Sequence, residues 1–174
     1  VSEVTGVISP VGDDDDFEIE LDDDQAMTVV LEPNAALWPK VEVYDPSGAL
    51  VTEVTAAARG ESLIVPLLDV PAMGNYQVKV GAVDGTTGGY ALKLMLNAVA
   101  EEESVHGDGN DTRPLAETLD PAMRTVAGDG ERATTVGRAD VTDEDWYAFS
   151  LLDGESASMF VAGERGADLS LELY

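Results

Sequence analysis

The stretch DDDFEIELDDDQAMTVVL, residues 14–31, is matched 130 residues later by EDWYAFSLLDGESASMFV, residues 144–161. The register continues without a gap to VEVY (residues 41–44) against LELY (residues 171–174). At every second position an apolar residue of the first copy aligns with an apolar residue of the second. The connection between successive strands has the same length in both copies. Such alternation is typical of β-strands that bury one face. A repeat much longer than a solenoid unit indicates two copies of a whole domain.

The alignment of the two copies divides the chain. Six positions are identical between residues 13–44 and 143–174, namely Asp13/Asp143, Asp15/Asp145, Leu21/Leu151, Asp23/Asp153, Glu42/Glu172 and Tyr44/Tyr174. We therefore expect a complete domain in residues 1–98, an acidic linker in residues 99–112 and the front half of a second copy in residues 113–174. We expect the remaining strands of the second copy to lie outside this chain.

Short alternating runs separated by Gly, Pro, Asp and Asn predict an all-β fold. The expected strands of the first copy are residues 3–9, 17–21, 27–31, 41–44, 50–54, 62–66, 76–80 and 90–96, and those of the second are residues 133–138, 146–151, 157–161 and 169–174. Eight short strands at this spacing favour an antiparallel sandwich in which one face of each sheet is buried. The linker carries a run of acids, several glycines and no periodicity, so we expect no regular structure there.

The net charge of −26 limits the partners of the protein. Residues 1–98 carry 17 acids and 4 bases, and residues 99–174 carry 18 and 5, so each part contributes −13. Such a field repels nucleic acid and anionic membranes, and we expect neither as a partner. No apolar run is long enough to span a membrane, so we expect no membrane insertion. Two explanations of the acidity stay open: adaptation to a saline habitat, and a surface that holds divalent cations.

The residue types needed for catalysis are scarce. The chain has no cysteine and one histidine, His106, which lies in the acidic linker. A relay or a transition-metal site built on a pair of histidines is therefore excluded. Carboxylates are abundant, but they lie in the loops of small domains without an evident cleft. We expect no enzymatic activity.

Both copies carry motifs of a known family. The second copy has Asn110-Asp111-Thr112, then an aromatic strand preceded by two acids, and finally LELY. The first copy has VEVYDPSG (residues 41–48), GNYQVKV (residues 74–80) and GGYALKL (residues 88–94). In this order the motifs resemble tandem bacterial pre-peptidase C-terminal domains, the second one incomplete, which are similar to the collagen-binding domains of secreted collagenases. The first copy departs from the pattern, because Asp16 stands where the second copy has Trp146 and no linker precedes it.

The resemblance implies a jelly-roll-like β-sandwich without catalytic activity, attached to secreted or cell-surface proteins. It also implies calcium held between acidic linker residues and an acidic loop before a strand. Calcium takes six to eight oxygen ligands, and such ligands are present in both places. The candidate ligands are Glu101, Glu103, Asp108, Asn110 and Asp111 in the linker and Asp143 and Asp145 before the aromatic strand. Asp13–Asp16 of the first copy form a weaker candidate.

These observations predict a non-catalytic accessory or spacer module of a secreted or cell-surface protein, with calcium (Ca²⁺) stabilising the linker between its domains. Its partners would be other domains of the same polypeptide or neighbouring copies. Two alternatives stay open. One is a structural repeat of an extracellular fibre or surface layer. The other is a module that binds an insoluble protein or polysaccharide, for which Trp38 and Trp146 are the available aromatic side chains.

Overall fold

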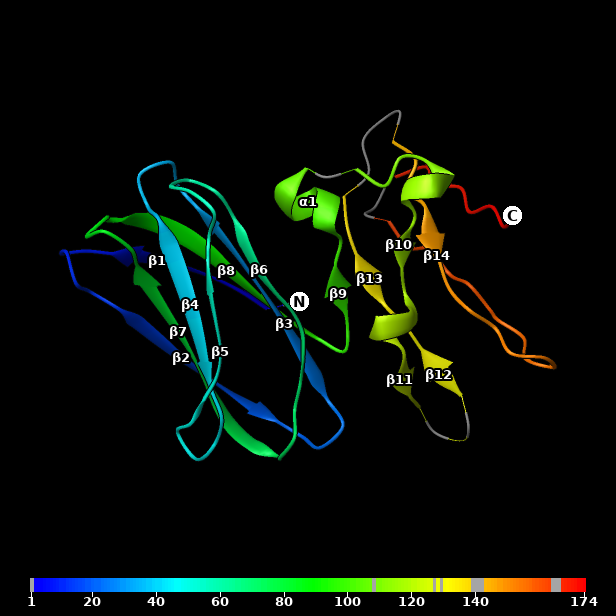
Figure 1. The fold of residues 1–174 in the computed structure, drawn as a ribbon, viewed down its shortest axis with the longest axis horizontal. Helices are drawn as coiled ribbons and strands as arrows, with labels where there is room; N and C mark the ends of the chain where they lie inside the picture. Colours follow the sequence, from blue (N-terminus) through cyan, green and yellow to red (C-terminus); the bar gives the residue numbers. More distant parts are fainter. Residues whose placement is uncertain (1, 108, 127, 129, 139–142, 164–166) are drawn as a thin grey trace.

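The computed structural model describes residues 2–107, 109–126, 128, 130–138, 143–163 and 167–174. Residues 2–96 form a sandwich of two four-stranded antiparallel sheets (Figure 1). One sheet has the order β1-β8-β3-β6 and the other β2-β7-β4-β5. The strands are β1 (Ser2–Ile8), β2 (Asp15–Leu21), β3 (Ala26–Pro33), β4 (Pro39–Tyr44), β5 (Leu50–Thr55), β6 (Leu63–Asp69), β7 (Gly74–Ala82) and β8 (Gly88–Leu96).

This strand order is that of a jelly roll, in which successive strands pass from one sheet to the other except at the β4–β5 hairpin. All eight strands expected in the first copy are present: β1 is shifted by one residue, and the other seven are longer than expected by one to four residues. The expected fold class, an all-β antiparallel jelly-roll-like sandwich, is therefore confirmed for this part of the chain. We refer to it below as the first sandwich.

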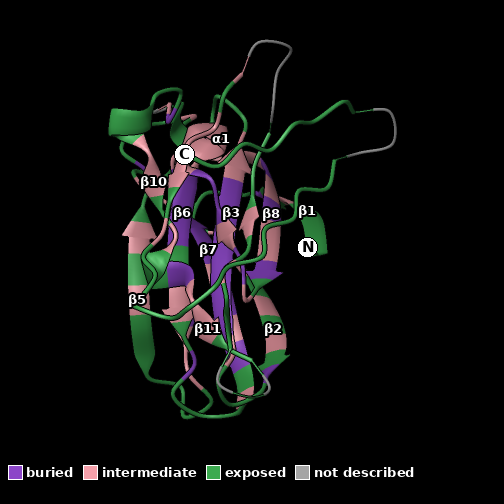
Figure 2. Ribbon diagram, turned by 90° about the vertical axis from the view of Figure 1, so that its right-hand side faces the viewer, coloured by how far each residue is buried: buried purple, intermediate pink, exposed green. Residues whose placement is uncertain are grey.

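The core of the first sandwich follows from the alternation of its strands. On β4, Val41 and Val43 are buried while the residues between them are partly exposed. On β7, Tyr76 and Val78 face the same interior, and the Tyr76 hydroxyl donates to the Ala72 carbonyl oxygen at 3.0 Å. Figure 2 shows the buried stretches concentrated on β3, β6 and β7. Burial of these apolar faces is the main free energy that holds the two sheets together.

Strand β3 differs because it is buried on both faces, in keeping with its continuous apolar run AMTVVL. Its outer face, with Val30, forms a second cluster with Ile64, Met95, Ala98 and Ala100. The Thr28 hydroxyl lies on this face and donates to the Ala98 carbonyl oxygen at 2.7 Å. The residues after β8 therefore cover the outer face of the first sheet and stay attached to the first sandwich.

The linker is more ordered than the sequence predicts. It contains β9 (Val99–Ala100), which pairs in parallel with β13 (Thr135–Val136), and the short helix α1 (Glu102–His106). Val105 of α1 packs against the cluster of Val30 and Ile64, and Gly107 ends the helix with a φ of 75°. The expectation of an irregular linker was wrong because a five-residue helix has no sequence period of its own. It forms where an apolar surface is available to it.

The C-terminal segment, residues 113–174, holds only short elements in its described part. Besides β13, these are single 3₁₀ turns at Arg113–Leu115 and Asp120–Ala122, and strands β10 (Glu117–Thr118), β11 (Arg124–Thr125), β12 (Glu131–Arg132) and β14 (Tyr147–Ala148). β10 pairs in parallel with β14, and β11 with β12 in antiparallel fashion. Arg124 forms an ion pair with Asp69 of β6 at 2.7 Å. None of the helices within the described residues is long and apolar enough to cross a membrane.

Two strands expected in the second copy are not formed, at residues 157–161 and 169–174. Their equivalents in the first sandwich, β3 and β4, are hydrogen-bonded to β5, β6, β7 and β8. Among the described residues of 113–174, no strand pairs with residues 157–161 or 169–174. A strand without a hydrogen-bonded neighbour leaves its backbone amides exposed to water. Its alternating apolar side chains then have no sheet to pack against.

Candidate metal centre

Three carboxylates from separate parts of the chain meet beside helix α1. Glu103 lies in the first turn of α1, Asp111 in the loop that follows, and Asp143 shortly before β14. One carboxylate oxygen of each lies within 4.8 Å of the others. Carboxylates held this close repel one another unless a cation or a proton lies among them. Burial, together with the charges of Asp111, Asp143 and Glu101, raises the pKa of Glu103 above its usual value, although the Asn110 amide N–H opposes the shift.

Asn110 places a neutral oxygen next to this cluster. Its side chain is 4% exposed, and its Nδ2 donates to the Trp146 carbonyl oxygen at 3.1 Å. Its backbone N–H donates to Glu103 Oε2 at 3.4 Å. The Oδ1 atom is buried and accepts no hydrogen bond from any residue that the structure describes. Buried polar atoms are nearly always satisfied, so this oxygen is suited to accept from a bound water or to ligate a cation.

Glu101 lies behind the cluster and is fully buried. Its carboxylate accepts hydrogen bonds from the Tyr147 hydroxyl, from Ser104 Oγ at 2.8 Å and from the Arg138 backbone N–H at 3.2 Å. Its own backbone N–H donates to the Val136 carbonyl oxygen at 3.0 Å. Glu101 therefore ties the start of α1 to β13 and β14, and its oxygens are already engaged by protein donors.

Asp145 is influenced by the charges of Glu101, Asp143 and Glu103. Its Oδ1 is buried and has no hydrogen-bond partner among the described residues. Burial beside other carboxylates favours the protonated, neutral form of a carboxyl group. Burial, followed by the charge of Glu101, raises the pKa of Asp145 to about 7.

This shift predicts how the region responds to pH without metal. Because the pKa of Asp145 is higher in the folded state than its usual value of 3.8, its contribution to stability is full below about pH 4 and is lost as the pH rises through 7. We expect the C-terminal segment, in EDTA, to unfold at lower urea concentration at pH 8 than at pH 5.5. Trp146 fluorescence measures this, and Asp145→Asn should flatten the dependence. A segment that is equally stable at both pH values with Asp145 intact would contradict the prediction.

Six of the seven predicted ligands lie in the described part of the chain, and Asp108 lies outside the described residues. The structure brings Glu103, Asp111 and Asp143 together at one point, with Asn110 beside them. Glu101 and Asp145 form a second pair that acts on this group through charge. The spacing of acids in the sequence did not distinguish the group of three carboxylates from the pair of Glu101 and Asp145.

Several supporting residues escaped the sequence analysis. The Tyr147 hydroxyl donates to Glu101, and burial and that hydrogen bond raise the pKa of Tyr147. Gly137 has no side chain where one would overlap the Glu101 carboxylate. A buried acid requires hydrogen-bond donors and space nearby. That requirement is the signal by which Tyr147 and Gly137 could have been identified from the sequence.

The acids of the first copy have different surroundings. Asp13 accepts a hydrogen bond from the Ser9 N–H at 2.9 Å, Asp14 pairs with Lys79 at 2.8 Å and Asp15 accepts from the Tyr90 hydroxyl at 2.7 Å. Among the described residues, only the group of Glu103, Asp111 and Asp143 has three acidic or metal-ligating side chains close enough to share an ion. Asp13, Asp14 and Asp15 thus serve as partners for donors of the first sandwich.

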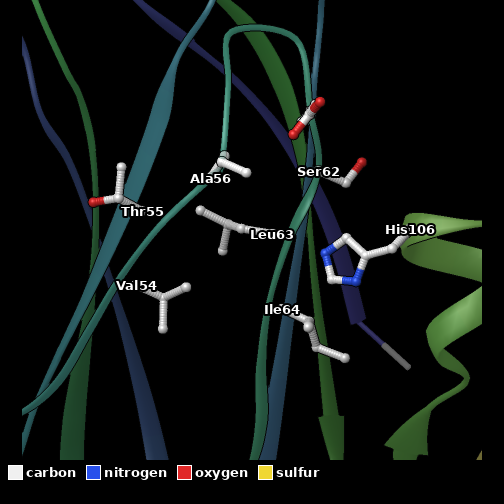
Figure 3. A pocket seen from close by; sticks show the side chains of 9 residues that line it. Val54, Thr55, Ala56, Ser62, Leu63, Ile64 and His106 are labelled. Carbon is white, nitrogen blue, oxygen red and sulfur yellow. The ribbon is translucent and has the colours of Figure 1, made fainter. Parts of the chain in front are cut away.

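His106 lies at the end of α1, where the helix meets the first sandwich. Its Nδ1 lies 2.8 Å from Glu102 Oε2. Figure 3 shows its ring pointing toward β6 over a shallow cleft of about 220 Å³. Residues 54–57 and 61–64 line the rest of this cleft. His106 thus contributes to the contact between α1 and the first sandwich.

The two tryptophans are not neighbours of each other. Trp38 packs against the core of the first sandwich, and its Nε1 donates to the Ala56 carbonyl oxygen at 2.8 Å. Trp146 is half-buried, and its ring lies 5.1 Å from that of Tyr174. They belong to separate parts of the chain and serve as separate fluorescent reporters.

Comparison with solved structures finds a collagenase domain and a periplasmic inhibitor among the similar structures. The pre-peptidase C-terminal domain of collagenase from Bacillus anthracis is 13% identical, with a TM-score of 0.41, over 54% of this chain and 88% of that domain. This is the family that the sequence motifs resemble. The periplasmic lysozyme inhibitor PliG of Aeromonas hydrophila is 15% identical, with a TM-score of 0.39, over 54% of this chain and 85% of PliG. At these values the likeness concerns the arrangement of strands, and no ligand follows from it.

No protein-family model and no curated protein sequence matches this chain. The function proposed below therefore depends on the geometry of its own residues.

Proposed function

We propose that this chain is a non-catalytic accessory or spacer module of a secreted or cell-surface protein, and that a calcium ion stabilises the linker between its two domains. Glu103, Asp111 and Asp143 would hold the ion, with Asn110 Oδ1 as a neutral ligand. The observation that carries the proposal is the convergence of these oxygens from the helix, the linker loop and the segment before β14. All the donors are hard oxygens, which suits calcium rather than a transition metal.

The position of the cluster explains what an ion would do. Glu103 belongs to α1, whose Val105 packs on the outer face of the first sandwich. Asp143 belongs to the C-terminal segment, which follows the linker. An ion shared by these side chains would join the two parts, whereas without it their negative charges push the parts away from each other. Bound calcium would thus set the orientation of one domain relative to the other.

A thermal and urea unfolding experiment with calcium tests the proposal. An ion that binds only the folded state adds RT ln(1 + [L]/Kd), about 2.7 kcal/mol at a hundredfold excess over Kd. We expect millimolar calcium, against EDTA at fixed high ionic strength, to raise the midpoint reported by Trp146. Asp143→Asn with Glu103→Gln should abolish the shift.

The matched control removes two acids of equal charge elsewhere. Glu18→Gln with Glu20→Gln changes exposed acids of β2, and the calcium shift should persist there. A shift that vanishes equally in both double variants, or that sodium chloride reproduces in full, would assign the acidity to salt adaptation. The spacer function would then stand without a metal.

A further inference from the structure

Strand β5 forms an open edge of the first sandwich. Within the described residues it pairs only with β4, so one side of its backbone has no strand beside it. The Ala56 N–H donates to the Pro39 carbonyl oxygen at 3.1 Å, and pairs with and without hydrogen bonds alternate along an antiparallel ladder. The backbone groups of Val54 therefore point toward β4, whereas those of Glu53 and Thr55 point outward, where a further strand would lie.

The other three edges of the first sandwich carry features that oppose pairing with a further strand. β2 exposes an acid at every second residue, β6 contains the exposed Pro66, and β1 exposes Glu3. Charges and prolines of this kind protect an edge from other chains. On β5 the one charged residue, Glu53, is engaged by Lys40 at 3.4 Å, and residues 49–58 hold no other charge. β5 is thus the least protected edge of the first sandwich.

A shallow cleft of about 220 Å³ adjoins this edge, between β5 and β6. Val54 and Leu63 line its apolar part, and Figure 3 shows Leu63 between Val54 and His106. Two acids stand at its rim, because Glu61 lines the cleft and the Glu102 carboxylate lies 2.8 Å from His106. The cleft therefore offers apolar contacts beside the outward backbone of β5, with negative charge around them.

We propose that β5 and this cleft bind an extended segment of another protein, which adds to the sheet as a strand beside β5. The outward groups of Glu53 and Thr55 supply the main-chain hydrogen bonds, and the cleft receives the apolar side chains of alternate residues. Glu61 and Glu102 select a segment with Lys or Arg two positions from an apolar residue, on the same side of the strand. A second copy of this chain is disfavoured, because two molecules of charge −26 repel each other. The calcium ion proposed above plays no part in this contact.

A defined peptide tests the proposal with the full chain in EDTA. The probe is Lys-Thr-Val-Thr-Val-Thr-Lys with blocked ends and a fluorescent label, so that its valines and lysines lie on one side of a strand. We expect saturable binding, and hydrogen exchange of the Glu53 and Thr55 amides about tenfold slower at saturation. The matched probe carries N-methyl groups on its threonine amides, which face β5 in this pairing. It keeps the charge and the side chains, and it should bind about tenfold more weakly.

Two pairs of variants test the same contact from the side of the chain. Thr55→Pro removes an outward N–H whereas Thr55→Val keeps it, so only the first should weaken peptide binding, by about tenfold. Glu61→Gln should also weaken binding, and Glu18→Gln, which removes an equal charge from β2, should not. The urea midpoint reported by Trp38 shows whether each variant is folded. If Thr55→Pro does not fold, the methylated probe tests the same hydrogen bonds with the unmodified chain.

Three results would overturn the proposal: no saturation by the unmethylated probe, equal binding of the two probes, or equal binding to folded Thr55→Pro and Thr55→Val. A concentration-dependent dimer in sedimentation, with Glu53 and Thr55 protected before any peptide is added, would overturn it as well and assign the edge to a second copy of the chain. Calcium is absent throughout, so a failure of the metal centre cannot produce any of these outcomes.

Discussion

Replacement of Glu101 by alanine is expected to unfold the linker and the C-terminal segment while the first sandwich stays folded. Glu101 is fully buried and accepts hydrogen bonds from Tyr147, Ser104 and the Arg138 backbone. Each buried donor left without an acceptor costs about 1–3 kcal/mol, and broken buried networks cost about 3–5 kcal/mol in all. Loss of the repulsion with Asp145 offsets part of this cost, so we expect about 3 kcal/mol.

The two tryptophans separate this effect from general unfolding. In a Trp38→Phe background, Trp146 should report a large decrease in the urea midpoint of Glu101→Ala. In a Trp146→Phe background, Trp38 should report nearly the midpoint of the unmodified first sandwich. Ser104→Ala, which removes one donor and leaves the carboxylate in place, is the matched control and should cost about 1 kcal/mol. A similar loss at both reporters would mean that Glu101 supports the whole molecule rather than the linker.

Replacement of Leu31 by alanine is expected to lower the unfolding free energy of the first sandwich by about 2–5 kcal/mol. Leu31 is fully buried on the central strand β3, opposite Leu63 of β6 and Leu92 of β8. Truncation of Leu31 removes apolar contacts and leaves a cavity. Because β3 is held between β6 and β8, it cannot move to fill that cavity. For a domain of this size each kcal/mol lowers the melting temperature by about 4–8 °C.

Leu50→Ala provides the comparison for this core substitution. Leu50 lies on the edge strand β5 and is 52% exposed, so its truncation should cost less than about 1 kcal/mol. Chemical unfolding followed by Trp38 measures both variants. Equal losses at the two positions would contradict the assignment of β3 to the centre of the core.

The strands of the first sandwich were predictable because their apolar residues alternate, and alternation depends only on neighbouring residues in the chain. Tyr90, Leu92 and Leu94 lie on one side of a strand whatever they pack against. The sequence predicted one buried face for each sheet, whereas β3 is buried on both faces because residues of β9 and α1 cover its outer side. The same rule failed for residues 157–161 and 169–174, because alternation states which face a strand would bury but does not provide its neighbours.

The candidate site was predictable in part. The residue types and their two locations in the chain indicated calcium chemistry, and Glu103, Asp111 and Asp143 do converge. Sequence spacing could not distinguish them from Glu101 and Asp145, because that difference depends on donors from β13, β14 and α1. The burial of Glu101, and with it the raised pKa of Asp145, arises only when these segments meet.

The sequence by itself determined the period of the repeat, the strands of the first sandwich and the excess of oxygen ligands, since each follows from neighbours along the chain. Only the tertiary structure decided that the linker forms a helix on the outer face of the first sheet, and which acids meet. Those outcomes depend on contacts between residues tens of positions apart, such as Thr28 with Ala98 and Glu101 with Tyr147. A pattern of neighbouring residues does not show the free energy of such contacts, because they form only when folding brings distant parts of the chain together.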